Sequence, residues 1–78
     1  MSERPKLFKR EEDALIAIRE FHQTNDKYPT IQELMLALDV SSTSTVSRYL
    51  TRLTEKGYIH REPYKARSMR IIHDEPPK

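Results

Sequence analysis

Residues 41–57 read SSTSTVSRYLTRLTEKG, and this stretch decides the fold. Its apolar residues recur at the three- and four-residue spacing that places side chains on one face of a helix. They are Val46, Tyr49, Leu50 and Leu53. Ser42 is a suitable N-cap, because its hydroxyl can accept a hydrogen bond from an amide of the first turn. Gly57 is the only glycine in the chain and permits a left-handed helix end. We therefore predict a helix from Thr43 to about Lys56.

Two helices are predicted upstream of this stretch. The residues TIQE at positions 30–33 have the form of a capping box, in which a hydroxyl and a carboxylate each satisfy a backbone amide. They begin a short helix that ends at Asp39. An earlier helix begins at Arg10, has acidic residues in its first turn and ends at residues 24–27. The predicted buried stripes are Ala14, Leu15, Ile18, Phe21 and His22 in the first helix, and Ile31, Leu34, Met35 and Leu38 in the second.

Two short strands are predicted downstream. The patterns at residues 58–61 and 68–72 favour strands, with Met69 and Ile71 pointing inward. Pro63, in the segment between them, suits the tip of a hairpin. The order helix, helix, turn, helix, hairpin is typical of the three-helix winged helix-turn-helix, a mostly α fold with a small β-hairpin.

Length and composition limit the organisation of the chain. Its 78 residues make one domain, and we expect an N-terminal arm at 1–9, the folded domain at 10–72 and a flexible tail or linker start at 73–78. The absence of cysteine excludes disulfides and thiolate chemistry and favours a reducing cytoplasm. No apolar run approaches the roughly 20 residues of a membrane-spanning helix, so no membrane association is expected.

Positive charge is concentrated in the second half of the chain. Residues 41–72 contain seven basic and two acidic side chains, a net charge of +5, whereas the whole chain carries +2. Such an asymmetry favours a polyanionic partner. An ordinary solvated surface is the alternative that the charge count leaves open.

The helix at 43–56 turns a polar face away from its apolar stripe. At about 100° per residue this face carries Ser44, Thr45, Arg48 and Arg52, flanked by Ser47 and Thr51. Small hydroxyls allow close approach to a major groove, and Arg48 can bridge O6 and N7 of guanine. A solvent-exposed face without a ligand is the alternative, but the hairpin and the basic half favour double-stranded DNA. The predicted backbone contacts are Thr30, Gln32, Arg52, Lys65, Arg67 and Arg70.

Four stretches carry a resemblance to a known family. They are AIREF at 17–21, YPTIQEL at 28–34, LTEKGYI at 53–59 and ARSMRI at 66–71. Over roughly residues 8–72 the chain resembles the N-terminal DNA-binding domain of LexA-type SOS repressors. The resemblance implies operator binding and transcriptional repression at the nucleoid. It also implies that bases are read by Ser42, Ser44, Thr45, Ser47 and Arg48.

The chain departs from the family pattern in two respects. LexA repressors typically have a proline after the capping serine, then an asparagine and a Glu-rich segment, whereas this chain has Thr43, Ser44 and Ser47-Arg48. We therefore expect an operator other than the usual SOS box. The 78 residues also leave no room for the family's Ser–Lys self-cleavage domain. The chain is thus expected to be either a piece cut at the linker or a stand-alone relative, and we favour the second.

No catalytic or metal site is predicted. His22, His60 and His73 are spread along the chain without a second ligand at metal spacing, and a single glycine does not make a phosphate-binding loop. We expect no cofactor, no small-molecule ligand and no enzyme activity. A winged-helix module that binds another protein is the alternative function, with Leu36 and Tyr64 as exposed apolar candidates.

A second copy of the chain is a further expected partner. A single winged helix has a small DNA interface, and two copies on a palindrome bind more tightly once they touch. The expected contacts between copies are Leu36 or the arm around Leu7 and Phe8.

Overall fold

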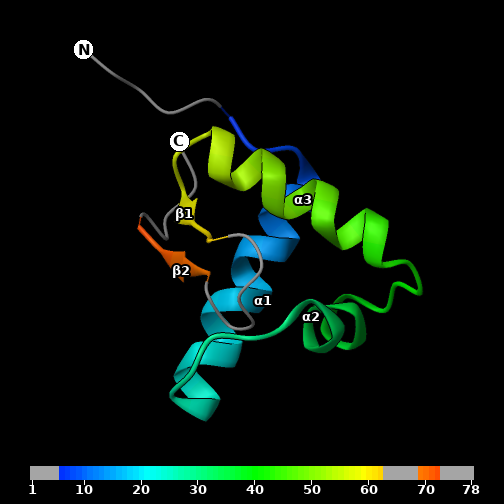
Figure 1. Ribbon diagram of the computed structural model, residues 1–78, viewed down its shortest axis with the longest axis vertical. Helices are drawn as coiled ribbons and strands as arrows, with labels where there is room; N and C mark the ends of the chain where they lie inside the picture. The colour runs from blue at the N-terminus through cyan, green and yellow to red at the C-terminus, as the bar shows by residue number, and fades with distance from the viewer. Residues whose placement is uncertain (1–5, 63–68, 73–78) are drawn as a thin grey trace.

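The computed structural model describes residues 6–62 and 69–72 and consists of three helices followed by a two-stranded hairpin (Figure 1). The helices are α1 (Lys9–Asn25), α2 (Ile31–Leu38) and α3 (Thr43–Glu55). The strands are β1 (Ile59–His60) and β2 (Arg70–Ile71). This order confirms the predicted winged helix-turn-helix. Among the described residues, no helix has both the length and the apolar character that crossing a bilayer requires.

The caps of α2 and α3 form as the sequence predicts. The Thr30 hydroxyl accepts from the Glu33 amide at 3.2 Å, and the Thr30 amide donates to Oε1 of Glu33 at 2.8 Å. At α3, the Ser42 hydroxyl accepts from the Thr45 amide at 3.4 Å. These bonds satisfy amides that have no partner inside the helix and so fix where α2 and α3 begin.

Each helix is followed by a residue whose backbone adopts the left-handed conformation. Asp26 and Asp39, the C-caps of α1 and α2, both have a φ of 57°, and Gly57 has a φ of 84° after α3. Glycine adopts this region without the steric cost of a Cβ atom. The chain therefore leaves α3 abruptly at Gly57 and enters β1 within two residues.

The N-terminus of α1 differs from the prediction. The helix begins at Lys9 rather than Arg10, and its N-cap is Phe8, whose amide donates to Oε1 of Glu11 at 3.1 Å. Leu7 packs against the core. The inner end of the expected arm is therefore part of the fold; Leu7 is half-buried, Phe8 is 70% exposed, and residues 1–5 lie outside the described part.

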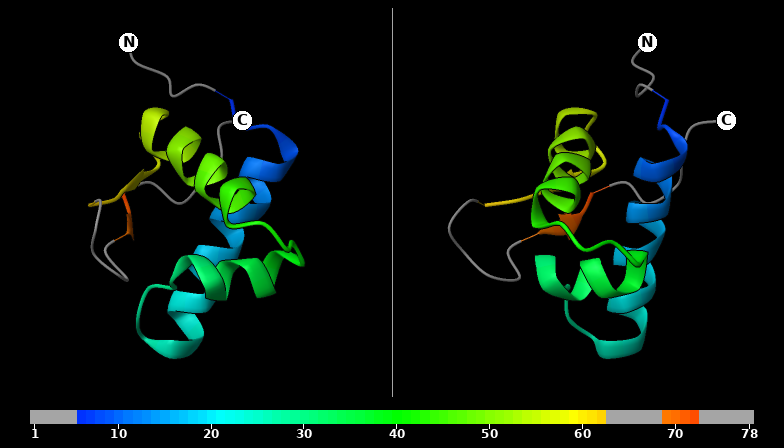
Figure 2. Two further views of the ribbon diagram at one scale, coloured as in Figure 1. Left: turned by 45° about the vertical axis from the view of Figure 1, so that its right-hand side comes forward. Right: turned by 90° about the vertical axis from the view of Figure 1, so that its right-hand side faces the viewer.

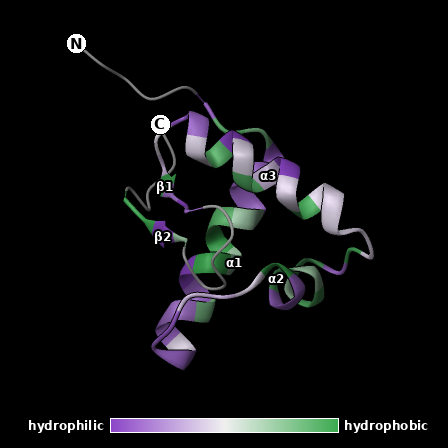
Figure 3. Ribbon diagram, in the orientation of Figure 1, coloured by the Kyte–Doolittle hydropathy of each residue, from purple (hydrophilic) through white to green (hydrophobic). Residues whose placement is uncertain are grey.

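The core lies where the three helices and the hairpin meet. Its buried hydrophobic residues are Ala14, Leu15, Ile18, Leu34, Val46, Leu50, Leu53, Tyr58, Ile59 and Met69. The predicted stripe residues outside this set are half-buried rather than buried; they are Phe21, His22, Ile31, Met35, Leu38 and Tyr49. Figure 3 shows hydrophobic and hydrophilic residues alternating along all three helices, as expected when only one face of each is buried.

The hairpin is antiparallel and shorter than predicted. Ile59 pairs with Ile71 and His60 with Arg70, and the Ile72 amide donates to the Tyr58 carbonyl at 2.9 Å. Figure 2 shows both strands beside α3. Side chains alternate across a strand, so burial of Ile59 leaves the His60–Arg70 pair exposed on the other face. The predicted hairpin tip, including Pro63, lies outside the described residues.

Candidate nucleic-acid interface

The predicted base-reading residues gather at the N-terminal half of α3. Ser42, Ser44 and Arg48 are exposed, whereas Thr45 and Ser47 are half-buried. The Ser42 hydroxyl accepts the capping hydrogen bond, which occupies one of its two lone pairs. Ser44 and Arg48 are therefore the exposed members of this set whose side chains take no part in the helix cap.

A shallow depression runs between α2 and the first half of α3. It is lined by Ile31, Thr43, Ser44, Ser47, Arg48 and Thr51. The structure thus brings Ser44, Ser47 and Arg48 together on one surface and adds Thr43, which the sequence prediction left out. Thr45, which is half-buried like Ser47, is not among the residues that line this depression.

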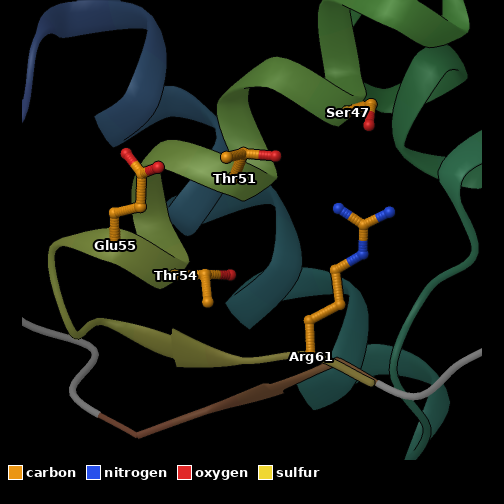
Figure 4. A pocket seen from close by; sticks show the side chains of 5 residues that line it. All are labelled: Ser47, Thr51, Thr54, Glu55 and Arg61. Carbon is orange, nitrogen blue, oxygen red and sulfur yellow. The ribbon is translucent and has the colours of Figure 1, made fainter. Parts of the chain in front are cut away.

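A second depression lies between the second half of α3 and the hairpin. Its lining consists of Ser47, Thr51, Thr54, Glu55 and Arg61 (Figure 4). Ser47 and Thr51 line both depressions, so the two are neighbours along α3. Arg61 was not among the predicted contacts, because nothing in the sequence fixes the direction of a side chain that follows a strand of two residues.

The residues predicted to contact the DNA backbone are more scattered over the domain than the predicted base-reading residues. Gln32, Arg52 and Arg70 are exposed on α2, α3 and β2 respectively. Thr30 is half-buried, and both its hydroxyl and its amide are engaged in the α2 capping box. The remaining two predicted contacts, Lys65 and Arg67, lie outside the described residues.

Lys56 belongs to the basic half of the sequence but not to the exposed surface. Its Nζ lies 2.6 Å from Oε1 of Glu11 and 2.8 Å from the carbonyl oxygen of Lys6. The same ammonium lies 4.5 Å from the centroid of the Phe8 ring. Glu11 neutralises this cation inside the protein, so Lys56 does not contribute to the charge that an external polyanion meets.

The described histidines serve no common site. His22 stacks on the ring of Tyr28, with centroids 4.1 Å apart, and His60 is exposed on β1. Within residues 6–62 and 69–72, no three His, Cys, Asp or Glu side chains form a group that could hold a metal ion. His73 lies outside the described residues.

Comparisons with known proteins identify the family to which the chain belongs. The family model described as the LexA DNA-binding domain matches residues 4–68. A LexA repressor of Bacillus mycoides is 42% identical over 69 residues, covering 88% of this chain and 34% of the relative. A LexA repressor of Staphylococcus aureus is 39% identical over 70 residues, covering 90% of this chain and 34% of the relative. The chain thus spans about a third of the length of these curated relatives. With a family match over most of its length and an α3 that presents a polar face beside the hairpin, the chain belongs to the LexA DNA-binding domain family.

Proposed function

We propose that this chain binds double-stranded DNA in a sequence-specific manner, in the cytoplasm at the nucleoid, and acts there as a transcriptional repressor. The observation that carries the proposal is the exposed surface of α3, where Ser44, Ser47 and Arg48 share one depression. The relatives named as LexA repressors support the repressing role. The proposal assigns no catalytic step to the chain.

Recognition follows from the shape and chemistry of α3. Because the side chains on this face are small hydroxyls, α3 can approach the base edges closely in a major groove, which admits an α-helix. Arg48 is exposed and can donate two parallel hydrogen bonds to O6 and N7 of one guanine. Ser42, Ser44, Thr45 and Ser47 read neighbouring base edges in this proposal. The backbone contacts proposed are Thr30, Gln32, Arg52, Lys65, Arg67 and Arg70.

The reading role of Arg48 is tested by alanine substitution. A preferred duplex is first selected from a pool of random sequences, and affinities are then measured for that duplex and for random DNA. Arg48→Ala is expected to cost about 1–3 kcal/mol on the preferred duplex and to relax the preference at one base pair. Folding should be unaffected, because Arg48 is exposed.

Arg52 provides the matched comparison, since it is exposed one turn further along α3. As a phosphate contact, Arg52→Ala should weaken binding to both duplexes alike and reduce the slope of log K against log salt by about 0.9. If Arg48→Ala lowers the affinity for both duplexes equally, Arg48 contacts a phosphate and does not read a base. Binding to no duplex at all would overturn the proposed function and favour a protein partner.

We further propose that the chain is a monomer in free solution and occupies palindromic sites in pairs. Half-sites of helix-turn-helix proteins lie about 10 bp apart, centre to centre. Leu36, with 84% of its surface exposed, is the residue best placed for contact between copies. Sedimentation of the free chain should give a monomer, and affinity should fall when half-site spacing is changed. A stable dimer without DNA contradicts the first expectation, and indifference to spacing contradicts the second.

A further inference from the structure

Arg61 lies near the proposed DNA-binding surface, but none of the DNA contacts proposed above is assigned to it. It follows β1 directly and is half-buried, although it is one of the most polar side chains in the domain. In Figure 4 its guanidinium extends over the depression beside α3, on the side of Ser47 and Thr51. Glu55 lines the same depression, but its carboxylate points away from the guanidinium.

The described surroundings of Arg61 provide no partner for its charge. Among residues 6–62 and 69–72, no carboxylate lies within ion-pair distance of its guanidinium and no hydrogen bond to it is formed. A guanidinium is always charged and offers five donors in a planar fork. The residue as a whole is half-buried, and no group of the described domain supplies an anion to its guanidinium. The arrangement is therefore suited to an anion that arrives from outside.

The neighbouring hydroxyls define what kind of anion fits. Ser47 and Thr51 line this depression together with Arg61, and hydroxyl donors beside a guanidinium match the non-bridging oxygens of a phosphate. The same two residues also line the depression that holds Arg48. Arg48 and Arg61 thus lie at the two ends of one continuous polar surface, and only the Arg48 end is assigned to base reading.

We propose that the depression between α3 and β1 is a subsite for one backbone phosphate of the DNA, bound by the Arg61 guanidinium with the Thr51 hydroxyl, while Ser47, which lines both depressions, keeps its base-reading role. The inference rests on the proposed DNA-binding function and adds a contact to it. Arg61 fixes how deeply α3 enters the groove, because it ties the strand that flanks α3 to the sugar–phosphate wall. It carries no base preference of its own, since phosphates are the same at every position.

The test combines a protein variant with DNA in which one backbone phosphate at a time is uncharged. In the preferred duplex, each phosphate near the site is replaced in turn by an uncharged methylphosphonate. At one such position, the methylphosphonate should lower the affinity of the wild-type chain several-fold. For the same position, Arg61→Gln should bind the modified and the unmodified duplex equally well. Arg61→Gln should also reduce the salt slope by about 0.9, equally for preferred and random DNA. Free inorganic phosphate at matched ionic strength should not compete with the duplex.

Arg10→Gln is the control, because it removes the same charge from an exposed position on α1. It should retain the wild-type response to every methylphosphonate. Thermal unfolding checks that Arg61→Gln stays folded, and removal of an unpaired half-buried charge should leave the melting temperature unchanged or raise it. If the wild type binds DNA and Arg61→Gln keeps the full salt slope and the same methylphosphonate response, the phosphate subsite is wrong while the DNA-binding function stands. Competition by free phosphate would likewise overturn the backbone assignment.

Discussion

Replacing Glu11 by glutamine is expected to lower the free energy of unfolding by about 3–5 kcal/mol. The Glu11 and Lys56 side chains are only 6% and 14% exposed, and their charged atoms lie 2.6 Å apart. Glutamine keeps the shape but leaves the Lys56 ammonium inside the protein without its counter-charge. The other neighbours of that ammonium, the Lys6 carbonyl and the Phe8 ring, carry no full negative charge to replace it.

A surface pair on the same helix supplies the matched control. Lys9 and Asp13 are 3.3 Å apart, but their side chains are 82% and 35% exposed. Asp13→Asn should therefore cost no more than about 0.5 kcal/mol. Urea unfolding at neutral pH, followed by circular dichroism, measures both variants. Equal small losses would show that the Glu11–Lys56 pair contributes nothing beyond a surface ion pair.

A double variant separates the pair from its surroundings. The loss of stability in Glu11→Gln is attributed to a Lys56 ammonium that has no counter-charge. If so, adding Lys56→Met should recover part of the free energy of unfolding rather than lower it further. Coupled residues in contact show this non-additivity, whereas independent sites add. Simple addition of the two single losses would contradict the assignment of the penalty to an unpaired buried charge.

Leu50→Ala is expected to destabilise the domain by about 2–5 kcal/mol. Leu50 is fully buried at the centre of α3, and alanine both removes apolar contacts and leaves a cavity. A domain of 60–100 residues loses about 4–8 °C of melting temperature for each kcal/mol. The melting temperature should therefore fall by about 8 °C or more, measured by thermal circular dichroism.

Leu36→Ala makes the same change of side chain on an exposed site. Because 84% of Leu36 is exposed, its loss should alter stability by no more than about 0.5 kcal/mol. Similar losses at Leu36 and Leu50 would mean that helix propensity, rather than burial, dominates both. That outcome would contradict the packing of α3 described above.

The sequence predicted the features of this fold that depend on residues close together in the chain. The Thr30–Glu33 capping box, the Ser42 cap and the Gly57 stop each involve partners within four residues, and all form as predicted. The apolar periods also predicted most of the core, because burial of one helix face follows from spacing alone. The ends of α3 could therefore be fixed from sequence to within one residue.

The features that the sequence did not predict depend on how separate elements pack. Glu11 is one of the acidic residues that the sequence places in the first turn of α1, where the helix dipole favours them, yet its carboxylate binds Lys56, 45 residues away. Arg61 enters the sequence analysis only as one of the seven basic residues of 41–72, yet its side chain lies beside α3. Neither outcome is encoded in local spacing, since each requires the relative position of two elements. The proposed DNA contacts remain predictions for the same reason: they depend on a duplex that meets these elements together.

The way α3 is held has a consequence for how its binding preference can change. The helix is fixed by Ser42, Gly57 and its buried leucines, whereas Thr43, Ser44 and Arg48 are exposed and contribute little to folding. Surface substitutions of this kind usually alter stability by no more than about 0.5 kcal/mol. Under the proposed function, the operator preference of such a domain can therefore diverge through single replacements at Ser44 and Arg48, with no compensating mutation in the core. A lineage that duplicated this gene would be free to retarget one copy while both copies kept the same fold.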